Sequence, residues 1–94
     1  MRVLIGTKDI PTAGTELQIS NTADKVKSIA VKARSTNTGS AFLGISDVGA
    51  TNGWTLLPGE AVALDFGDGS IAFSVFYLDV ATSGDDIDWA AVLE

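Results

Sequence analysis

Residues 26–34 read VKSIAVKAR, and the alternation in this stretch decides the fold. Successive side chains of an extended strand point to opposite sides, so Ile29, Val31 and Ala33 share one face. The other face carries Ser28, Ala30, Lys32 and Arg34. This pattern predicts a half-buried antiparallel strand, with one side on the core and the other facing solvent or a partner.

Similar short runs, separated by turn residues, extend in both directions from this strand. We expect strands at residues 3–5, 16–19, 26–34, 41–45, 54–56, 61–66, 71–80 and 87–93. The run 71–80 is apolar on both parities apart from Ser74 and Asp79, which predicts a central strand buried on both faces. No stretch predicts a convincing helix.

The turns between these runs have recognisable chemistry. Asn52-Gly53 and Gly67-Asp68-Gly69 supply residues that tolerate a positive φ, and Leu57-Pro58-Gly59-Glu60 has Pro and Gly where a type II turn needs them. About eight short strands, with turns roughly every ten residues, predict one all-β sandwich or jelly-roll-like domain over residues 1–94. Residues 1–10 are expected either as an arm that adds to a partner's sheet or as an ordinary edge strand.

The predicted core collects the apolar residues on the inward parity of these strands. Its members are Leu17, Ile29, Val31, Leu43, Ile45, Leu56, Val62, Leu64, Phe73, Val75, Phe76, Leu78, Ile87 and Trp89.

A chain of 94 residues builds a thin core, which small domains reinforce with disulfides, a metal or oligomerisation. The sequence contains no cysteine and no histidine, and 46% of its residues are hydrophobic. Oligomerisation is therefore the favoured reinforcement, and the apolar surplus fits a chain that covers surface against partners.

Charge is divided unevenly along the chain. Residues 1–34 hold all six basic residues and three acids, whereas residues 35–94 hold nine acids and no base. A total charge of −6 argues against nucleic acid as the principal partner. The acids have two possible roles. They keep the loops in contact with water, or the basic and the acidic parts of the chain contact different neighbours, or each other's copies, in an assembly.

Catalytic patterns are absent from the sequence. Without histidine the commonest general base is missing, and neither Ser-x-x-Lys nor Gly-x-Ser-x-Gly occurs. We therefore expect no enzyme, no catalytic residue, no cofactor and no metal. Two alternatives stay open. One is calcium held by Asp85, Asp86 and Asp88, or by Asp65 and Asp68, and the other is sugar stacking on Trp54 beside its turn.

No run approaches the length of a membrane helix or of the apolar core of a signal peptide. We therefore expect a soluble protein, made in a cytoplasm, that has no membrane partner.

Several turn motifs together resemble those of small tailed-phage virion proteins. The stretches that carry the resemblance are Ala13–Leu17, Val26–Ala33, Asn37-Thr38-Gly39 leading into Phe42-Leu43-Gly44, Gly53–Glu60 and Thr82–Asp85. Proteins with this pattern at this size are often β-sandwich capsid decoration (cement) proteins, which commonly form trimers on the shell. The resemblance implies no catalytic residue.

This resemblance implies a decoration protein on the capsid surface of a virion. Its expected partners are other copies of the same chain, with which it would form a homotrimer, and the major capsid protein. The alternatives are another virion component, such as a head-completion, tail or baseplate protein, or a small carbohydrate-binding module. The residues expected at partner interfaces are Arg2, Val3, Leu4, Ile5, Lys8, Lys32, Arg34 and Trp54.

Overall fold

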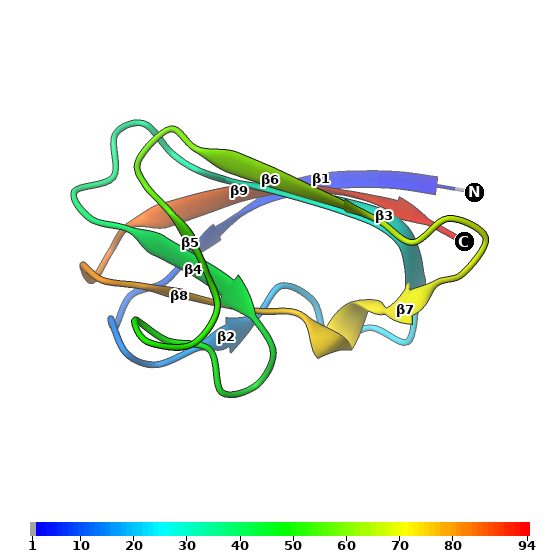
Figure 1. Cartoon of the computed structure of the whole chain (residues 1–94), viewed down its shortest axis with the longest axis horizontal. Helices are drawn as coiled ribbons and strands as arrows, with labels where there is room; N and C mark the ends of the chain where they lie inside the picture. The colour runs from blue at the N-terminus through cyan, green and yellow to red at the C-terminus, as the bar shows by residue number, and fades with distance from the viewer. Residues whose placement is uncertain (1) are drawn as a thin grey trace.

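The structure is a computed structural model that describes residues 2–94, and over this range the chain forms two antiparallel sheets packed face to face (Figure 1). A short 3-10 turn, η1 (Phe73–Val75), interrupts the strands. The strands are β1 (Arg2–Asp9), β2 (Leu17–Gln18), β3 (Lys25–Ala33), β4 (Ala41–Gly44), β5 (Trp54–Leu56), β6 (Ala61–Asp65), β7 (Ile71–Ala72), β8 (Tyr77–Val80) and β9 (Asp86–Leu93).

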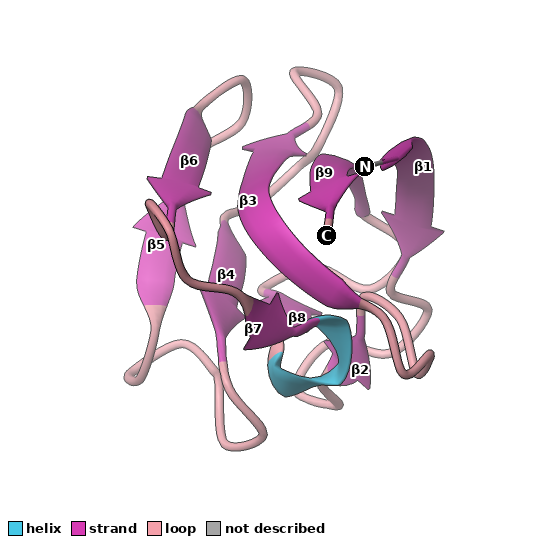
Figure 2. Cartoon of the chain, turned by 90° about the vertical axis from the view of Figure 1, so that its right-hand side faces the viewer, coloured by secondary structure: helices cyan, strands magenta, loops and turns pink. Residues whose placement is uncertain are grey.

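The strand order is that of a jelly roll. One sheet runs β1-β9-β3-β6, with β7 also paired to β3, and the other runs β2-β8-β4-β5. The pairs β1 with β9, β2 with β8, β3 with β6 and β4 with β5 come from the two halves of the chain, as in a long hairpin rolled into two layers. Figure 2 shows the layers from one end, with β1 above β2 on one side and β6 above β5 on the other. The all-β sandwich prediction is confirmed.

The prediction of one central strand over residues 71–80 is wrong. Ile71 and Ala72 pair with β3 in the first sheet, whereas residues 77–80 pair with β2 and β4 in the second. Between them η1 carries the chain from one layer to the other, and Phe73 is fully buried on the way. The segment is apolar on both parities because it crosses the core, not because it lies in the middle of a sheet.

The core prediction is largely confirmed, with two errors. Leu17, Val62, Leu64 and Trp89 are half-buried against the core, and the predicted residues that are fully enclosed are Ile29, Val31, Leu43, Leu56, Phe73, Phe76, Leu78 and Ile87. Ile45 and Val75 are instead 56% and 40% exposed. Ile45 comes after the end of β4, so it is outside the strand. Val75 lies in η1, where side-chain directions repeat every three residues and not every two, so the alternation of a strand does not predict its burial. Buried residues that the prediction left out include Ile10, Ile19, Val26, Val80, Ala91 and Leu93.

The first residues form an edge strand of the chain's own sheet. β1 pairs with β9 from Arg2 opposite Leu93 to Asp9 opposite Asp86, so of the two alternatives for residues 1–10 the structure has the edge strand. Residue 1 lies outside the described range. Directly after β1, Ile10 is fully buried, and its backbone N–H donates to the carbonyl of Asp85.

Two turn motifs that lie far apart in the sequence bind each other at one end of the sandwich. The carboxylate of Asp85 accepts the backbone N–H groups of Thr38 at 3.1 Å and Gly39 at 2.9 Å. The side-chain amide of Asn37 donates to the carbonyl of Asp86 and accepts its N–H. Asp85 is only 8% exposed, so this acid fixes the backbone of a neighbouring turn.

Candidate interaction surface

The outward side of the five-stranded sheet, which we call the outer face, carries exposed apolar side chains. Strand parity and register place on it Val3, Ile5 and Thr7 of β1, Asp88, Ala90 and Val92 of β9, Ser28, Ala30 and Lys32 of β3, and Ala61, Ala63 and Asp65 of β6. Val3 is 62% exposed and Ile5 is 78% exposed. Apolar side chains gathered in this way on a surface commonly mark an interaction site.

Alanine forms the floor of the outer face. The register aligns Ile5, Ala90, Ala30 and Ala63 in one row across four strands. Two open hollows of about 200 and 310 Å³ lie over this row and share Ala30 and Ala90. The short side chains leave the middle of the face low while Ile5 stands at its border, so the outer face is shaped to receive protruding side chains.

A polar network closes one end of the outer face. The Thr7 hydroxyl donates to Asp88 Oδ1 at 2.8 Å, and Arg34 Nε donates to the same oxygen at 2.9 Å. Arg34 Nη2 also donates to the Thr7 hydroxyl at 3.2 Å, and Arg34 Nη1 lies 3.7 Å from Asp86. These contacts join β1 and β9 to the residue that follows β3, and they fix the guanidinium beside the apolar rows.

The two acids of this network are shifted in opposite directions. The hydrogen bond from Thr7, followed by that from Arg34, lowers the pKa of Asp88 below its ordinary value. Partial removal from water, followed by the hydrogen bond and the charge of Asp9, raises the pKa of Asp86. Asp9 lies directly opposite Asp86 in the β1–β9 pair, where like charges oppose pairing.

The predicted interface residues divide between separate parts of the molecule. Val3, Ile5 and Lys32 lie on the outer face, and Arg34 borders it. The other predicted interface residues of β1 are Arg2, Leu4 and Lys8. They have the opposite parity and lie on the side of β1 that faces the second sheet. Arg2 pairs with Asp24 at 2.9 Å, and Leu4 stays 36% exposed.

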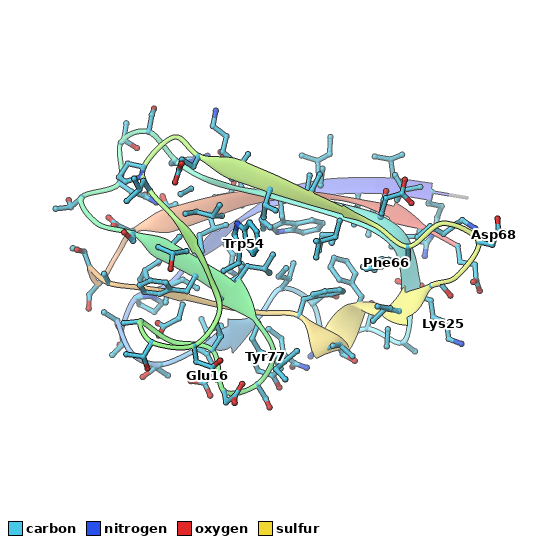
Figure 3. The ribbon with its side chains drawn as sticks, in the orientation of Figure 1. Glu16, Lys25, Trp54, Phe66, Asp68 and Tyr77 are labelled. Carbon is cyan, nitrogen blue, oxygen red and sulfur yellow. The ribbon has the colours of Figure 1, made fainter. Side chains whose placement is uncertain are left out.

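Trp54 lies away from the outer face, at the edge of the sandwich where the edge strands β5 and β6 leave an opening between the two sheets. Figure 3 looks onto this opening, with Trp54 near its middle. Trp54 is 62% exposed and borders an apolar cleft of about 160 Å³. The cleft is lined by Leu43, Gly44, Ile45, Trp54, Val62, Leu64 and Phe76. The structure therefore does not bring Trp54 together with the outer face.

Sequence reasoning missed the small residues of the outer face, which are Ala30, Ala61, Ala63, Ala90 and Val92. The signal was present, because the polar parity of each strand should carry polar side chains, and β6 and β9 place alanine and valine there instead.

Two of the acids proposed for calcium, Asp85 and Asp88, are committed to other contacts. Asp85 binds backbone N–H groups, and Asp88 binds Thr7 and Arg34. Within residues 2–94, no three acidic side chains converge as a metal site would require. In the same range, no helix is long and apolar enough to cross a membrane.

No family model matches this chain, and a search of curated proteins finds no match.

Proposed function

We propose that this chain is a non-enzymatic virion subunit that decorates a phage capsid and stabilises the shell by binding it through the outer face. The observation that carries the proposal is the exposed apolar pair Val3 and Ile5 beside the alanine row. A water-facing sheet surface usually carries polar residues at these positions, so their apolar character is best explained by a protein partner that covers them.

The fold and the turn motifs support the choice of partner. Jelly rolls occur in viral capsid and lectin domains, so the fold is compatible by analogy with a place in a virion. The resemblance of the turn motifs to small virion proteins points in the same direction. A sheet face with a low apolar middle and a polar border suits docking on the outer surface of a shell, and the Arg34 network supplies orientation at one end.

The test is binding to purified empty capsids of the phage that encodes the chain, measured by co-sedimentation. Ala30→Glu places a carboxylate in the middle of the outer face, where it would be buried on binding, so we expect occupancy to fall at least tenfold. Ala50→Glu, in an exposed loop away from this face, is the matched control and should bind as the wild type does. Equal binding of Ala30→Glu, or no binding by the wild type, would overturn the proposal.

The exposed Trp54 favours a second candidate, a carbohydrate-binding module that stacks a sugar on the indole. A titration with a panel of oligosaccharides, followed by tryptophan fluorescence, separates the two. A saturable change that is lost in Trp54→Ala would support this candidate, and a flat titration would remove it.

A further inference from the structure

We propose that copies of this chain associate edge to edge, with β1 of one copy adding to the free edge of β6 in the next. The five-stranded sheet then continues across the subunit boundary. The proposal does not rest on capsid binding, because it concerns the two edges of the sheet and a second copy of the chain.

The sheet ends in two unpaired edges. Within residues 2–94, β1 pairs with β9 on one side, β6 pairs with β3 on one side, and the remaining side of each strand has no partner. Such an edge presents unpaired backbone N–H and C=O groups, which is a template for another strand. Both edges are available in every copy, so one contact can be repeated from copy to copy.

The strand directions allow this contact. Every neighbouring pair in the order β1-β9-β3-β6 is antiparallel, so β1 and β6 run in opposite directions. A second copy rotated about an axis parallel to the strands keeps its strand directions. Its β1 therefore arrives antiparallel to β6, and the contact continues the pattern of the sheet.

The register follows from the row that already crosses the sheet. Ile5 and Ala63 lie in the same row and point to the same face, so continuing the row sets Ile5 of one copy opposite Ala63 of the next. On the inward parity the same register sets Leu4 opposite Leu64 and Lys8 opposite Glu60. The first is an apolar pair and the second is a pair of opposite charge, both of which favour antiparallel pairing.

The apolar cleft beside Trp54 lies where this strand would arrive. Leu64 lines the cleft from the inward side of β6, and Leu4 is 36% exposed on the inward side of β1. Pairing in the inferred register brings Leu4 over the cleft and removes both surfaces from water. The second layer agrees, because β5 lies below β6 and β2 lies below β1 (Figure 2), so the edges of both sheets meet together.

The size of the outer face gives a reason for such association. Four strands spaced by about 4.8 Å, and five residues of about 3.3 Å each, cover a footprint of roughly 300 Å². Stable interfaces bury about 800 Å² on each partner, so a single outer face would bind weakly. Copies joined through their edges would bind a shared partner with avidity. A contact between two different edges closes into a ring or grows as a filament.

Disulfide trapping tests the contact directly, because the sequence has no cysteine of its own. One protein carries Ile5→Cys and the other carries Ala63→Cys, and the two are mixed under mild oxidation. Within one chain these positions are three strands apart, about 14 Å, which is beyond the reach of a disulfide. We expect a mixed disulfide dimer on a non-reducing gel, and an extended ladder or closed ring when both substitutions are in one chain.

The control mixes Ile5→Cys with Leu57→Cys, a residue that is 55% exposed but lies in the turn before β6. We expect at least tenfold less disulfide in this mixture. The mass of the wild type in solution should be at least twice the 9.7 kDa of one chain. A monomer at all concentrations, or equal trapping in the two mixtures, would overturn the inference. Loss of capsid binding in an intact oligomer would instead count against the proposed function alone.

Discussion

The indole of Trp89 lies over Gly6 on the neighbouring strand, and a Cβ added to residue 6 would meet Trp89 Cζ2 at 2.7 Å. The same indole meets the ring of Phe73 edge to face, with centroids 5.4 Å apart. The aromatic ring thus connects the edge strand β1 to the core through a residue that has no side chain. Such a pair of glycine and aromatic residue stabilises a strand that would otherwise contribute little inward surface.

Gly6→Ala should therefore destabilise the fold. The added methyl group must displace a ring that is held on its other side by Phe73, and overpacking of this kind costs about 1–3 kcal/mol. The measurement is the free energy of unfolding in urea. Gly69→Ala is the matched control, because its Cβ would meet Phe66 O at an ordinary 3.4 Å. Equal stability of Gly6→Ala and the wild type would show that the indole moves freely.

Asp85→Ala should loosen the turn at Asn37-Thr38-Gly39. Without the carboxylate, the N–H groups of Thr38 and Gly39 lose their acceptor, and because Thr38 is exposed and Gly39 half-buried, we expect a loss at the low end of about 1–3 kcal/mol. Hydrogen exchange at the Thr38 and Gly39 amides should accelerate more than exchange in β3. Asp68→Ala, at an exposed turn, serves as the control. Unchanged exchange at these two amides would contradict the role given to Asp85.

Asp9→Asn should stabilise the protein at neutral pH and leave it unchanged near pH 3. Because the pKa of Asp86 is raised in the folded state, its contribution to stability is present below the ordinary value of 3.8 and is lost as the pH rises through the raised pKa. Removing the Asp9 carboxylate reduces that loss, with an expected gain of about 0.2–1 kcal/mol. Urea unfolding at pH 3 and pH 7 measures the difference, and a gain of the same size at both values would refute the explanation.

Asp88→Asn should have the opposite effect. The pKa of Asp88 is lowered in the folded state, so its contribution is present above the ordinary value of 3.8 and is lost as the pH falls through the lowered pKa. We expect the variant to be less stable at pH 7 by about 0.2–1 kcal/mol, and equal to the wild type at the acid end. The same unfolding series provides the measurement, and a deficit that persists in acid would assign the effect to packing.

Prediction from the sequence succeeded where the side-chain period of a strand was sufficient. The inward row of β3 and the shared face of Ile87, Ala91 and Leu93 are buried as expected, and Gly59 has the φ of +89° that a type II turn requires. The prediction was wrong at residues 71–80. A strand in the middle of a sheet and a segment that crosses between layers are both buried on two sides, so both have an apolar sequence on both parities. The side of β3 that carries Ala30 was expected to face solvent or a partner, but nothing in the sequence indicated that alanines of β6 and β9 would lie in the same row.

The sequence by itself determined the all-β class, most of the core and the positions of the turns, because these depend on local periodicity and on residues that permit particular backbone angles. Only the tertiary structure decided which strands are edges and which residues from distant strands share a row. Ile5, Ala90, Ala30 and Ala63 come from four separate segments, and their alignment depends on pairing register across long sequence separations. The outer face is a product of that register, which no local pattern specifies.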